Sequence, residues 1–334
     1  MKQSTEDRPS VAFGEEVLRI DAPAESTRIE NALRDALRTF KRRGLVVAIS
    51  GGIDSSVVLG LAVRALGADR VCALMLPEQD SSPETRRLSL LVAESFGVEP
   101  VEENITAVLT AYGCYERRNA AVRTVIPSFS DDHTMKIVLP SVVESDRYRV
   151  FSVVTESPDG KRTEARLPPD AYLGIVAASN FKQRVRKTFE YYYADKLNYA
   201  VAGTPNKLEY DQGFFVKNGD GSADVKPIAH LYKSQVYQLA GHLGVPQEII
   251  SRPPTTDTYS MPQSQEEFYF SLPYDKMDLC LYARENGVET ETVASALGLT
   301  GEQVERVLRD IDQKRKTTAY LHTAPVVLST QGLE

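Results

Sequence analysis

Short apolar runs alternate with amphipathic segments along the first hundred residues of the chain. The runs at 45–49 and 71–76 are hydrophobic without interruption, which is typical of strands buried on both faces. Segments 25–44, 55–67 and 83–97 instead repeat hydrophobic residues at helical spacing. The connections between these segments are short. The pattern therefore predicts an α/β fold, with a doubly wound parallel sheet that carries helices on both faces.

This alternation stops between residues 113 and 172. The stretches at 135–141, 147–156 and 161–169 favour β-structure, and a Pro-Asp-Gly turn at 157–161 separates the last two. We expect a β-hairpin region inserted into the α/β domain, although a decorated surface loop fits the same pattern equally well.

Helical patterns return after the insertion. Residues 170–198 and 229–244 read as helices, and the apolar run 199–203 between them reads as a buried strand. The polar segment 252–268 carries three prolines and is expected to be an ordered loop or lid. Residues 274–316 predict short helices, of which a pair resembles a helix-turn-helix and is interpreted as structural packing. The chain is therefore expected to form one domain, 1–334, with the insertion at 113–172.

Composition narrows the class of protein. The 334 residues are 42% hydrophobic and 25% charged, with a formal net charge of −7, which argues against a role in coating nucleic acid. Cys72, Cys114 and Cys280 are far apart and match neither a disulfide framework nor a CxxC metal site. The N-terminus lacks the apolar core of a signal peptide, and we find no apolar run long enough to cross a bilayer. These features predict a cytoplasmic protein without a membrane or nucleic-acid partner.

The segment Ser50-Gly51-Gly52-Ile53-Asp54-Ser55-Ser56 lies between a predicted strand and a helix expected from Ser55. A helix N-terminus presents unpaired backbone N–H groups and a favourable dipole to an anion. The two glycines allow the backbone to approach a phosphate closely, and the serines add hydroxyl donors. No lysine stands in the Walker position, which excludes a mononucleotide P-loop. A capped Gly-Gly turn without a ligand is the alternative.

Asp54 is unexpected beside a phosphate, because the two negative charges repel. A Mg²⁺ ion held by a carboxylate and by phosphate oxygens would resolve this conflict. The motif SGGxDS resembles the pyrophosphate loop of the ATP pyrophosphatase group, whose members cleave ATP between the α and β phosphates. That group includes NAD, GMP and asparagine synthetases and tRNA-modifying enzymes, so the loop alone names a chemistry and not a substrate.

Five downstream segments resemble the NAD synthetase family. They are SNFKQRVRKT (179–188), GTPNKLEYDQGFFVKNGDGSAD (203–224), PIAHLYKSQV (227–236), RPPTTD (252–257) and LPYDKMD (272–278). They occur in the family's order, and the resemblance covers most of the chain outside 113–172. It implies that ATP adenylates the carboxylate of deamido-NAD, and that ammonia then displaces AMP to form NAD.

The resemblance also implies roles for individual residues. Asp54 and Glu209 would ligate Mg²⁺, and Lys233 would contact ATP phosphates. Asp54, Lys217 and Lys233 form the implied catalytic set. The implied ATP contacts are Ser50, Gly51, Gly52, Ile53, Asp54, Ser55, Ser56, Thr204, Lys233 and Thr255. The implied deamido-NAD contacts are Arg184, Lys217, Asp224, Gln313 and Lys314.

The chain departs from the family pattern in three places. Gln313 replaces a common histidine, Val216 replaces a usual threonine, and the insertion exceeds the ordinary linker. The family also implies a homodimer, with the helix that carries Arg184 at its interface. Only about 45 residues precede the loop, which leaves no room for a glutamine-hydrolysing domain. Free ammonia is therefore the expected nitrogen source, unless a separate amidotransferase delivers it.

Three other functions remain open at this stage. An amide ligase of the same group could act on another carboxylic acid and would form AMP without deamido-NAD. A catalytically silent nucleotide sensor could keep the fold, but it would not need the Asp54 and Glu209 pair. A nucleic-acid-modifying relative is disfavoured by the negative net charge and by the lack of a basic region interleaved with aromatic residues.

Overall fold

A four-stranded parallel sheet forms the centre of the computed structural model, which describes residues 13–139, 150–256, 258–270, 272–329 and 332–333. The strands are β1 (Leu45–Ala48), β2 (Val71–Met75), β3 (Val101–Glu102) and β7 (Ala200–Ala202). Their order is β3-β2-β1-β7, and each neighbouring pair is parallel. Strand β1 is therefore interior, and the loop that follows it opens at the middle of the sheet's carboxyl edge.

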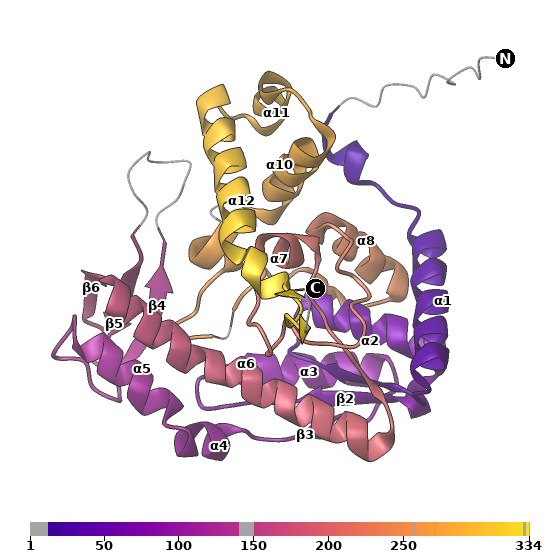
Figure 1. The fold of residues 1–334 in the computed structure, drawn as a ribbon, viewed down its shortest axis with the longest axis horizontal. Coiled ribbons are helices and arrows are strands. Elements are labelled where there is room, and N and C mark those ends of the chain that lie inside the picture. Colours follow the sequence, from indigo (N-terminus) through magenta and orange to yellow (C-terminus); the bar gives the residue numbers. More distant parts are fainter. Residues whose placement is uncertain (1–12, 140–149, 257, 271, 330–331, 334) are drawn as a thin grey trace.

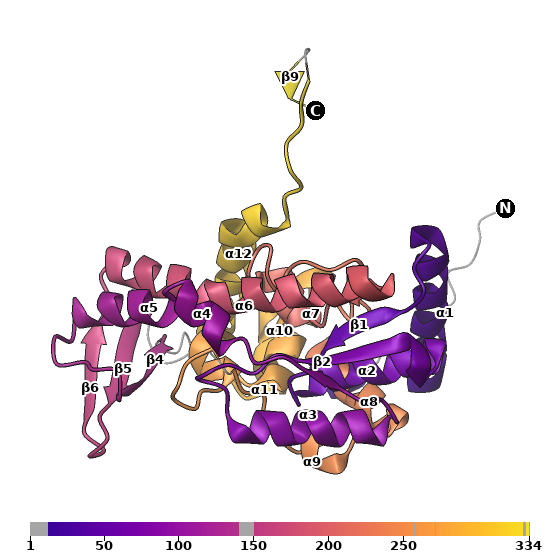
Figure 2. The same ribbon diagram turned by 90° about the horizontal axis from the view of Figure 1, so that it is seen from below.

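Helices cover both faces of this sheet, as Figure 2 shows, with α6 on one side of the strands and α2 and α3 on the other. One layer contains α1 (Ala22–Phe40), α2 (Ile53–Leu66), α3 (Pro83–Ser95) and α8 (Lys233–Leu243), and the other contains α4 (Thr106–Ala111), α5 (Cys114–Arg123) and α6 (Pro169–Leu197). Leu45 and Val47 of β1 pack in the first layer, whereas Val46 packs in the second. The predicted doubly wound α/β fold is confirmed.

The inserted region forms a small antiparallel sheet at the end of the molecule away from α1 (Figure 1). Its strands are β4 (Thr134–Val138), β5 (Ser152–Glu156) and β6 (Arg162–Arg166). Strands β5 and β6 form the predicted hairpin, and β4 adds a third strand along the other edge of β5. Its own apolar cluster includes Met135, Ile137 and Val153. The region begins with helix α5, which the β-rich pattern did not predict.

The C-terminal part is helical, as predicted. Helices α10 (Tyr274–Asn286), α11 (Thr290–Leu297) and α12 (Gly301–His322) share an apolar cluster that includes Met277, Val293 and Val304. Helix α12 continues six residues beyond the predicted limit at 316. Within the described ranges, no helix combines the length and apolar character that crossing a bilayer requires.

Short elements complete the chain. They are the 3₁₀ turns Glu15–Leu18 and Ala68–Arg70, α7 (Lys207–Gln212), α9 (Gln247–Ile250), a π turn at Glu266–Phe270, and the ribbon β8 (Leu328–Ser329) with β9 (Gly332–Leu333). Helix α2 begins at Ile53, two residues before the predicted start, because Gly52 already serves as its N-cap. Asp54 therefore belongs to the first turn of the helix.

Candidate active site

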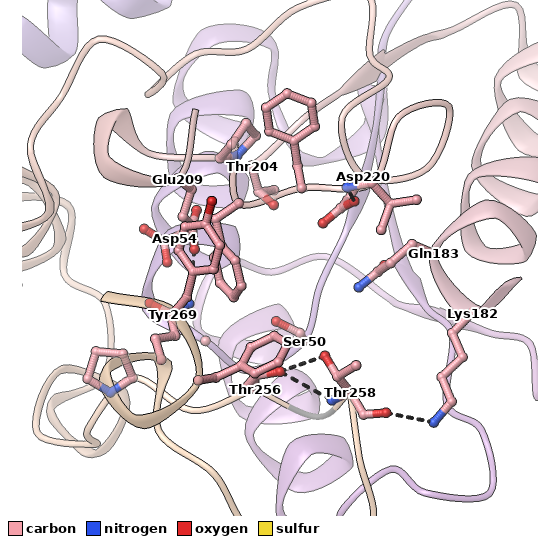
Figure 3. A pocket seen from close by; sticks show the side chains of 18 of the residues that line it. Ser50, Asp54, Lys182, Gln183, Thr204, Glu209, Asp220, Thr256, Thr258 and Tyr269 are labelled. Atoms are coloured by element: carbon pink, nitrogen blue, oxygen red, sulfur yellow. Dashed lines mark hydrogen bonds between the residues drawn. The ribbon is translucent and has the colours of Figure 1, made fainter. Parts of the chain in front are cut away.

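A cavity of about 1360 Å³ opens at the carboxyl ends of β1, β2 and β7. Its wall combines the β1–α2 turn, the inner side of α6, the loops at 202–220 and 252–269, and the face of α12 around Lys314. These segments are far apart in sequence. Figure 3 shows Asp54 and Glu209 together on one side of the cavity, with Lys182 and Gln183 across from them. This is where ligands bind in open α/β sheets.

The β1–α2 turn is shaped by its glycines and by its own hydroxyl groups. Gly51 has φ +66°, and a Cβ there would lie 2.6 Å from the Cβ of Leu88 on α3. The Ser55 hydroxyl donates to the carbonyl of Gly52 at 3.1 Å, and the Ser56 hydroxyl donates to the same carbonyl at 2.8 Å. The N-terminus of α2, from Gly52 to Ser55, lines the cavity, which is where a helix would bind an anion.

Asp54, Glu209 and Lys233 meet at the base of this turn. Lys233 Nζ pairs with Asp54 Oδ2, and Asn206 Nδ2 donates to Asp54 Oδ1 at 3.0 Å. Asn206 also caps α7, where its backbone N–H donates to Glu209 Oε2 at 3.1 Å. Gln265 Nε2 donates to Glu209 Oε1 at 2.9 Å. One asparagine therefore aligns both carboxylates, which lie 155 residues apart in the sequence.

Burial and mutual proximity shift the pKa values of Glu209 and Lys233. Desolvation and the nearby charge of Asp54 raise the pKa of Glu209 to about 7. Burial disfavours the charged form of Lys233, but the carboxylates of Asp54 and Glu209 outweigh it and raise the pKa of that ammonium group. Two carboxylates thus face a single buried cation. A further cation between the carboxylates and a phosphate would lower the energy of both anions.

The donor set suits Mg²⁺. Carboxylate oxygens are the hard ligands that this ion prefers, and it usually takes one or two of them beside phosphate oxygens and water. Among the described residues, no three His, Cys, Asp or Glu side chains gather into a metal cluster. Asp54 and Glu209 are the two carboxylates that would hold Mg²⁺ beside the phosphate oxygens of a nucleotide.

Asp278 is a positioning residue to which the sequence assigned no role. Its Oδ1 accepts the backbone N–H of Lys233 at 3.1 Å, and its Oδ2 accepts that of Ser234 at 2.7 Å. It therefore caps the N-terminus of α8 and fixes the start of the helix that carries Lys233. Burial raises the pKa of Asp278 to about 6, although the two N–H groups and Lys233 oppose the shift.

Four of the five residues expected to contact the dinucleotide line the cavity. Arg184, Lys217, Gln313 and Lys314 all line it, as do Thr204 and Thr255. Lys217 Nζ donates to the carbonyls of Tyr320 and Thr323, at 2.9 and 3.0 Å. Lys314 Nζ donates to the carbonyl of Tyr269 at 2.7 Å. The two lysines therefore tie the C-terminal end of α12 and the 252–269 loop to the cavity wall.

Two of the expected contacts lie outside the cavity wall. Ser56 is buried, and its hydroxyl is used within α2. Asp224 accepts the backbone N–H of Val201 through Oδ2 at 2.7 Å, and the hydroxyl of Tyr191 approaches its Oδ1 at 3.3 Å. In this structure both residues support the framework around the site. Their expected ligand contacts remain predictions.

A buried polar network on α6 was not predicted from the sequence. Lys182 Nζ donates to Glu78 Oε1 at 2.9 Å, to Asp80 Oδ2 at 2.6 Å and to the carbonyl of Thr258 at 2.9 Å. Arg118 from α5 also pairs with Asp80. The network joins the β2–α3 loop and the inserted region to the 252–269 loop. The available signal was the helical spacing that places Lys182 in line with the apolar residues Ala178 and Val185 of a long helix.

Comparisons with known proteins point to one family. The family model described as NAD synthase matches residues 25–126 and 153–320. A "NH(3)-dependent NAD(+) synthetase" of Rhizobium meliloti (strain 1021) is 59% identical over 96% of this chain and 96% of its own length. A protein of the same name from Thermotoga neapolitana is 35% identical over 85% of this chain and 91% of its own length.

Solved structures share the fold. An "NH3-dependent NAD synthetase from Campylobacter jejuni" matches with a TM-score of 0.60 and 21% identity, over 93% of this chain and all of that one. An "NMN synthetase from Francisella tularensis" matches with a TM-score of 0.60 and 22% identity, over 92% of this chain and 99% of that one. At such identities the match concerns the fold alone. The family match and the 59% identical relative decide the family, and this chain belongs to the NAD synthase family.

Proposed function

We propose that this chain is a ligase that amidates deamido-NAD to NAD with ATP and ammonia, and that it releases AMP and pyrophosphate. The relatives named NH(3)-dependent NAD(+) synthetases support this activity through their high identity over nearly the whole chain. The observation that carries it is the placement of Asp54, Glu209 and Lys233 beside the N-terminus of α2, because these groups can hold a metal–nucleotide complex.

The first half of the reaction needs a good electrophile at the carboxyl carbon. A carboxylate oxygen of deamido-NAD attacks the α-phosphorus of ATP, and the bond to the pyrophosphate leaving group breaks. We assign the backbone N–H groups of the α2 N-terminus and the ammonium of Lys233 to the departing phosphates. Mg²⁺, held by Asp54 and Glu209, would supply further positive charge next to the pyrophosphate.

In the second half, ammonia attacks the carbon of the acyl adenylate and AMP leaves. The adenylate hydrolyses if water reaches it first, so the site must close before it forms. The loops at 205–225 and 255–268 are our candidates for this closure. We assign Arg184, Lys217, Asp224, Gln313 and Lys314 to deamido-NAD, and Thr204 and Thr255 to ATP.

Three further assignments belong to this proposal. The exposed stripe of α6 carries Leu173, Ala177, Thr188 and Tyr192 around Arg184, and we infer that it forms a homodimer interface. We place the enzyme in the cytoplasm, which agrees with three free and buried cysteines. Free ammonia is the proposed nitrogen donor, and a separate amidotransferase would act only as its supplier.

The decisive experiment incubates the purified chain with ATP, Mg²⁺, deamido-NAD and ammonium, and follows AMP and NAD. We expect NAD and AMP in equal amounts. Parallel reactions replace deamido-NAD by nicotinic acid mononucleotide or by other carboxylic acids. Folded protein that forms AMP only with another acid would establish a sibling ligase. Nucleotide binding with no turnover on any acid would establish a silent sensor.

A further inference from the structure

The edge of strand β4 that does not pair with β5 is covered by part of the 252–269 loop, which lines the cavity. The family model leaves residues 127–152 unmatched, and β4 lies within that gap. One edge of β4 pairs with β5. The other edge would expose unpaired backbone groups, which folded proteins normally cover. Here the cover is the segment 260–267, which we call the lid segment.

Hydrogen bonds fasten the lid segment along β4. Ser260 Oγ accepts the N–H of Met135 at 2.9 Å, and the carbonyl of Met135 accepts the N–H of Met261 at 3.1 Å. Gln263 Nε2 donates to the carbonyl of Ile137 at 2.5 Å. Lys136 Nζ donates to Glu267 Oε1 at 2.6 Å. These bonds span the whole strand, so the position of β4 determines the position of the lid segment.

The opposite side of the lid segment reaches the catalytic group. Gln265 lies between the β4 anchors and donates through Nε2 to Glu209 Oε1 at 2.9 Å. The other oxygen of that carboxylate is held by the backbone N–H of Asn206. Gln265 therefore decides how the outer oxygen of Glu209 is oriented. Just before the lid segment, the carbonyl of Thr258 is held by Lys182, the contact drawn as a dashed line in Figure 3.

We propose that strand β4 is a positioning element of the active site, because it holds the lid segment so that Gln265 orients Glu209 toward the metal–nucleotide complex. This inference rests on the proposed role of Glu209 as a metal ligand. A carboxylate that lacks its hydrogen-bond donor can rotate freely, and it loses this rotational entropy when it binds a metal. Removal of such donors weakens metal affinity about 10–100-fold. Gln265 acts through Glu209 and is a positioning residue.

The anchors can be altered without disturbing the core. The side chains of Lys136 and Glu267 are 17% and 38% exposed, and neither belongs to the apolar cluster of the inserted region. A change there that weakens metal-dependent binding would therefore act through the placement of the lid segment. The same pair permits a charge swap, Lys136→Glu with Glu267→Lys, in which each single variant is the control for the other.

The measurement is the dissociation constant of ATP with Mn²⁺ and, separately, in EDTA, by calorimetry without deamido-NAD. For Gln265→Leu we expect about a tenfold or greater loss of affinity with Mn²⁺ and no change in EDTA. Gln247→Leu is the matched control, because that amide donates to Ser251 within its own exposed turn. Equal losses in both conditions, or no loss in either, would overturn the role of Gln265.

The charge-swap series tests the role of β4. We expect each single variant to weaken ATP binding about threefold to tenfold with Mn²⁺ only, and the double variant to return to within about twofold of the parent. The role of β4 would be overturned if all three variants had the parent's dissociation constant. It would also be overturned if the double variant did not restore the affinity that the single variants lose. Thermal unfolding of all variants should match the parent, which separates positioning from loss of fold.

These binding experiments and the test of the proposed function can fail separately. A parent chain that makes NAD but has variants with unchanged binding constants would refute the positioning role and leave the proposed function intact. A parent chain that makes no NAD but shows the metal-dependent losses would refute the function and retain the positioning role.

Discussion

At the residue scale, the site depends on two carboxylates and one ammonium group that are largely buried from water. Lys233 neutralises one of the negative charges, and Asn206 holds both carboxylates in place. The remaining negative charge is what suits the site to a metal–nucleotide complex. Each member is therefore required for its charge as well as for its contacts.

The substitution Asp54→Ala should give a folded protein that no longer releases pyrophosphate. It removes one proposed metal ligand and frees the buried Lys233 from its ion pair. We expect AMP formation to fall at least about 100-fold, in line with the loss of one charge-stabilising group in other active sites. Circular dichroism and a coupled pyrophosphate assay measure fold and rate. Retained turnover would contradict the metal assignment.

Asp278 makes stability depend on pH in an unusual direction. Its folded-state pKa of about 6 lies above the ordinary aspartate value of 3.8, so between these values the folded chain keeps a proton that the unfolded chain has lost. The free energy of unfolding therefore falls as the pH rises through this window. Relative to Asp278→Asn, the parent should lose about 2–3 kcal/mol between pH 4 and pH 7. Urea unfolding at both pH values checks this, and parallel profiles would contradict it.

At the element scale, the β1–α2 turn functions because it packs directly on α3. The backbone at Gly51 adopts a left-handed conformation and passes within contact distance of Leu88 and Ser89. Gly52 makes no such approach, because a Cβ there would meet only Ser50 Oγ at 3.4 Å. The two neighbouring glycines therefore have different tasks.

This difference predicts unequal effects of alanine at the two positions. Gly51→Ala should destabilise the protein by about 2 kcal/mol or more, because it adds left-handed strain to a steric overlap with α3. Gly52→Ala should cost less than half of that amount. Urea unfolding of both variants measures the difference, and equal losses would show that the packing against α3 is not limiting.

At the scale of the whole molecule, the cavity exists only because five segments meet over one sheet edge. The inner side of α6 forms one wall of that cavity. The outer side of the same helix carries the stripe around Leu173 and Tyr192. These two side chains are 60% and 54% exposed, which is high for large apolar groups on one helix. A second copy of the chain is the partner that we propose for this surface.

The dimer prediction is tested by sedimentation velocity. The parent should sediment at twice the chain mass of 37.0 kDa, and the double variant Leu173→Asp with Tyr192→Asp should sediment as a monomer. Leu90→Asp is the control, since Leu90 is an exposed apolar residue on α3, in the opposite layer. A parent that is monomeric at micromolar concentration would contradict the prediction.

Much of this arrangement could be predicted from local patterns. The buried runs at 45–49 and 71–76 became β1 and β2, and the helical spacing of 83–97 became α3. The predicted β-structure at 135–141 became β4, but the contact of β4 with the lid segment could not be predicted, because residues 260–267 are more than a hundred residues away. Asp278 and Gln265 gave no local signal either, since each acts through a contact with a distant segment.

Hydrophobic periodicity and short motifs are local properties of the chain, and they were sufficient to predict the fold class, the turn between β1 and α2, and the family. Only the tertiary structure decided that Asn206 aligns Asp54 with Glu209, and that Lys217 and Lys314 tie α12 and the 252–269 loop to the cavity wall. It also placed Asp224 behind the wall of the cavity and β4 along the lid segment. The reason is physical: side chains far apart in the chain acquire their burial, their charge neighbours and their hydrogen-bond partners only when the sheet and its covering layers close around them.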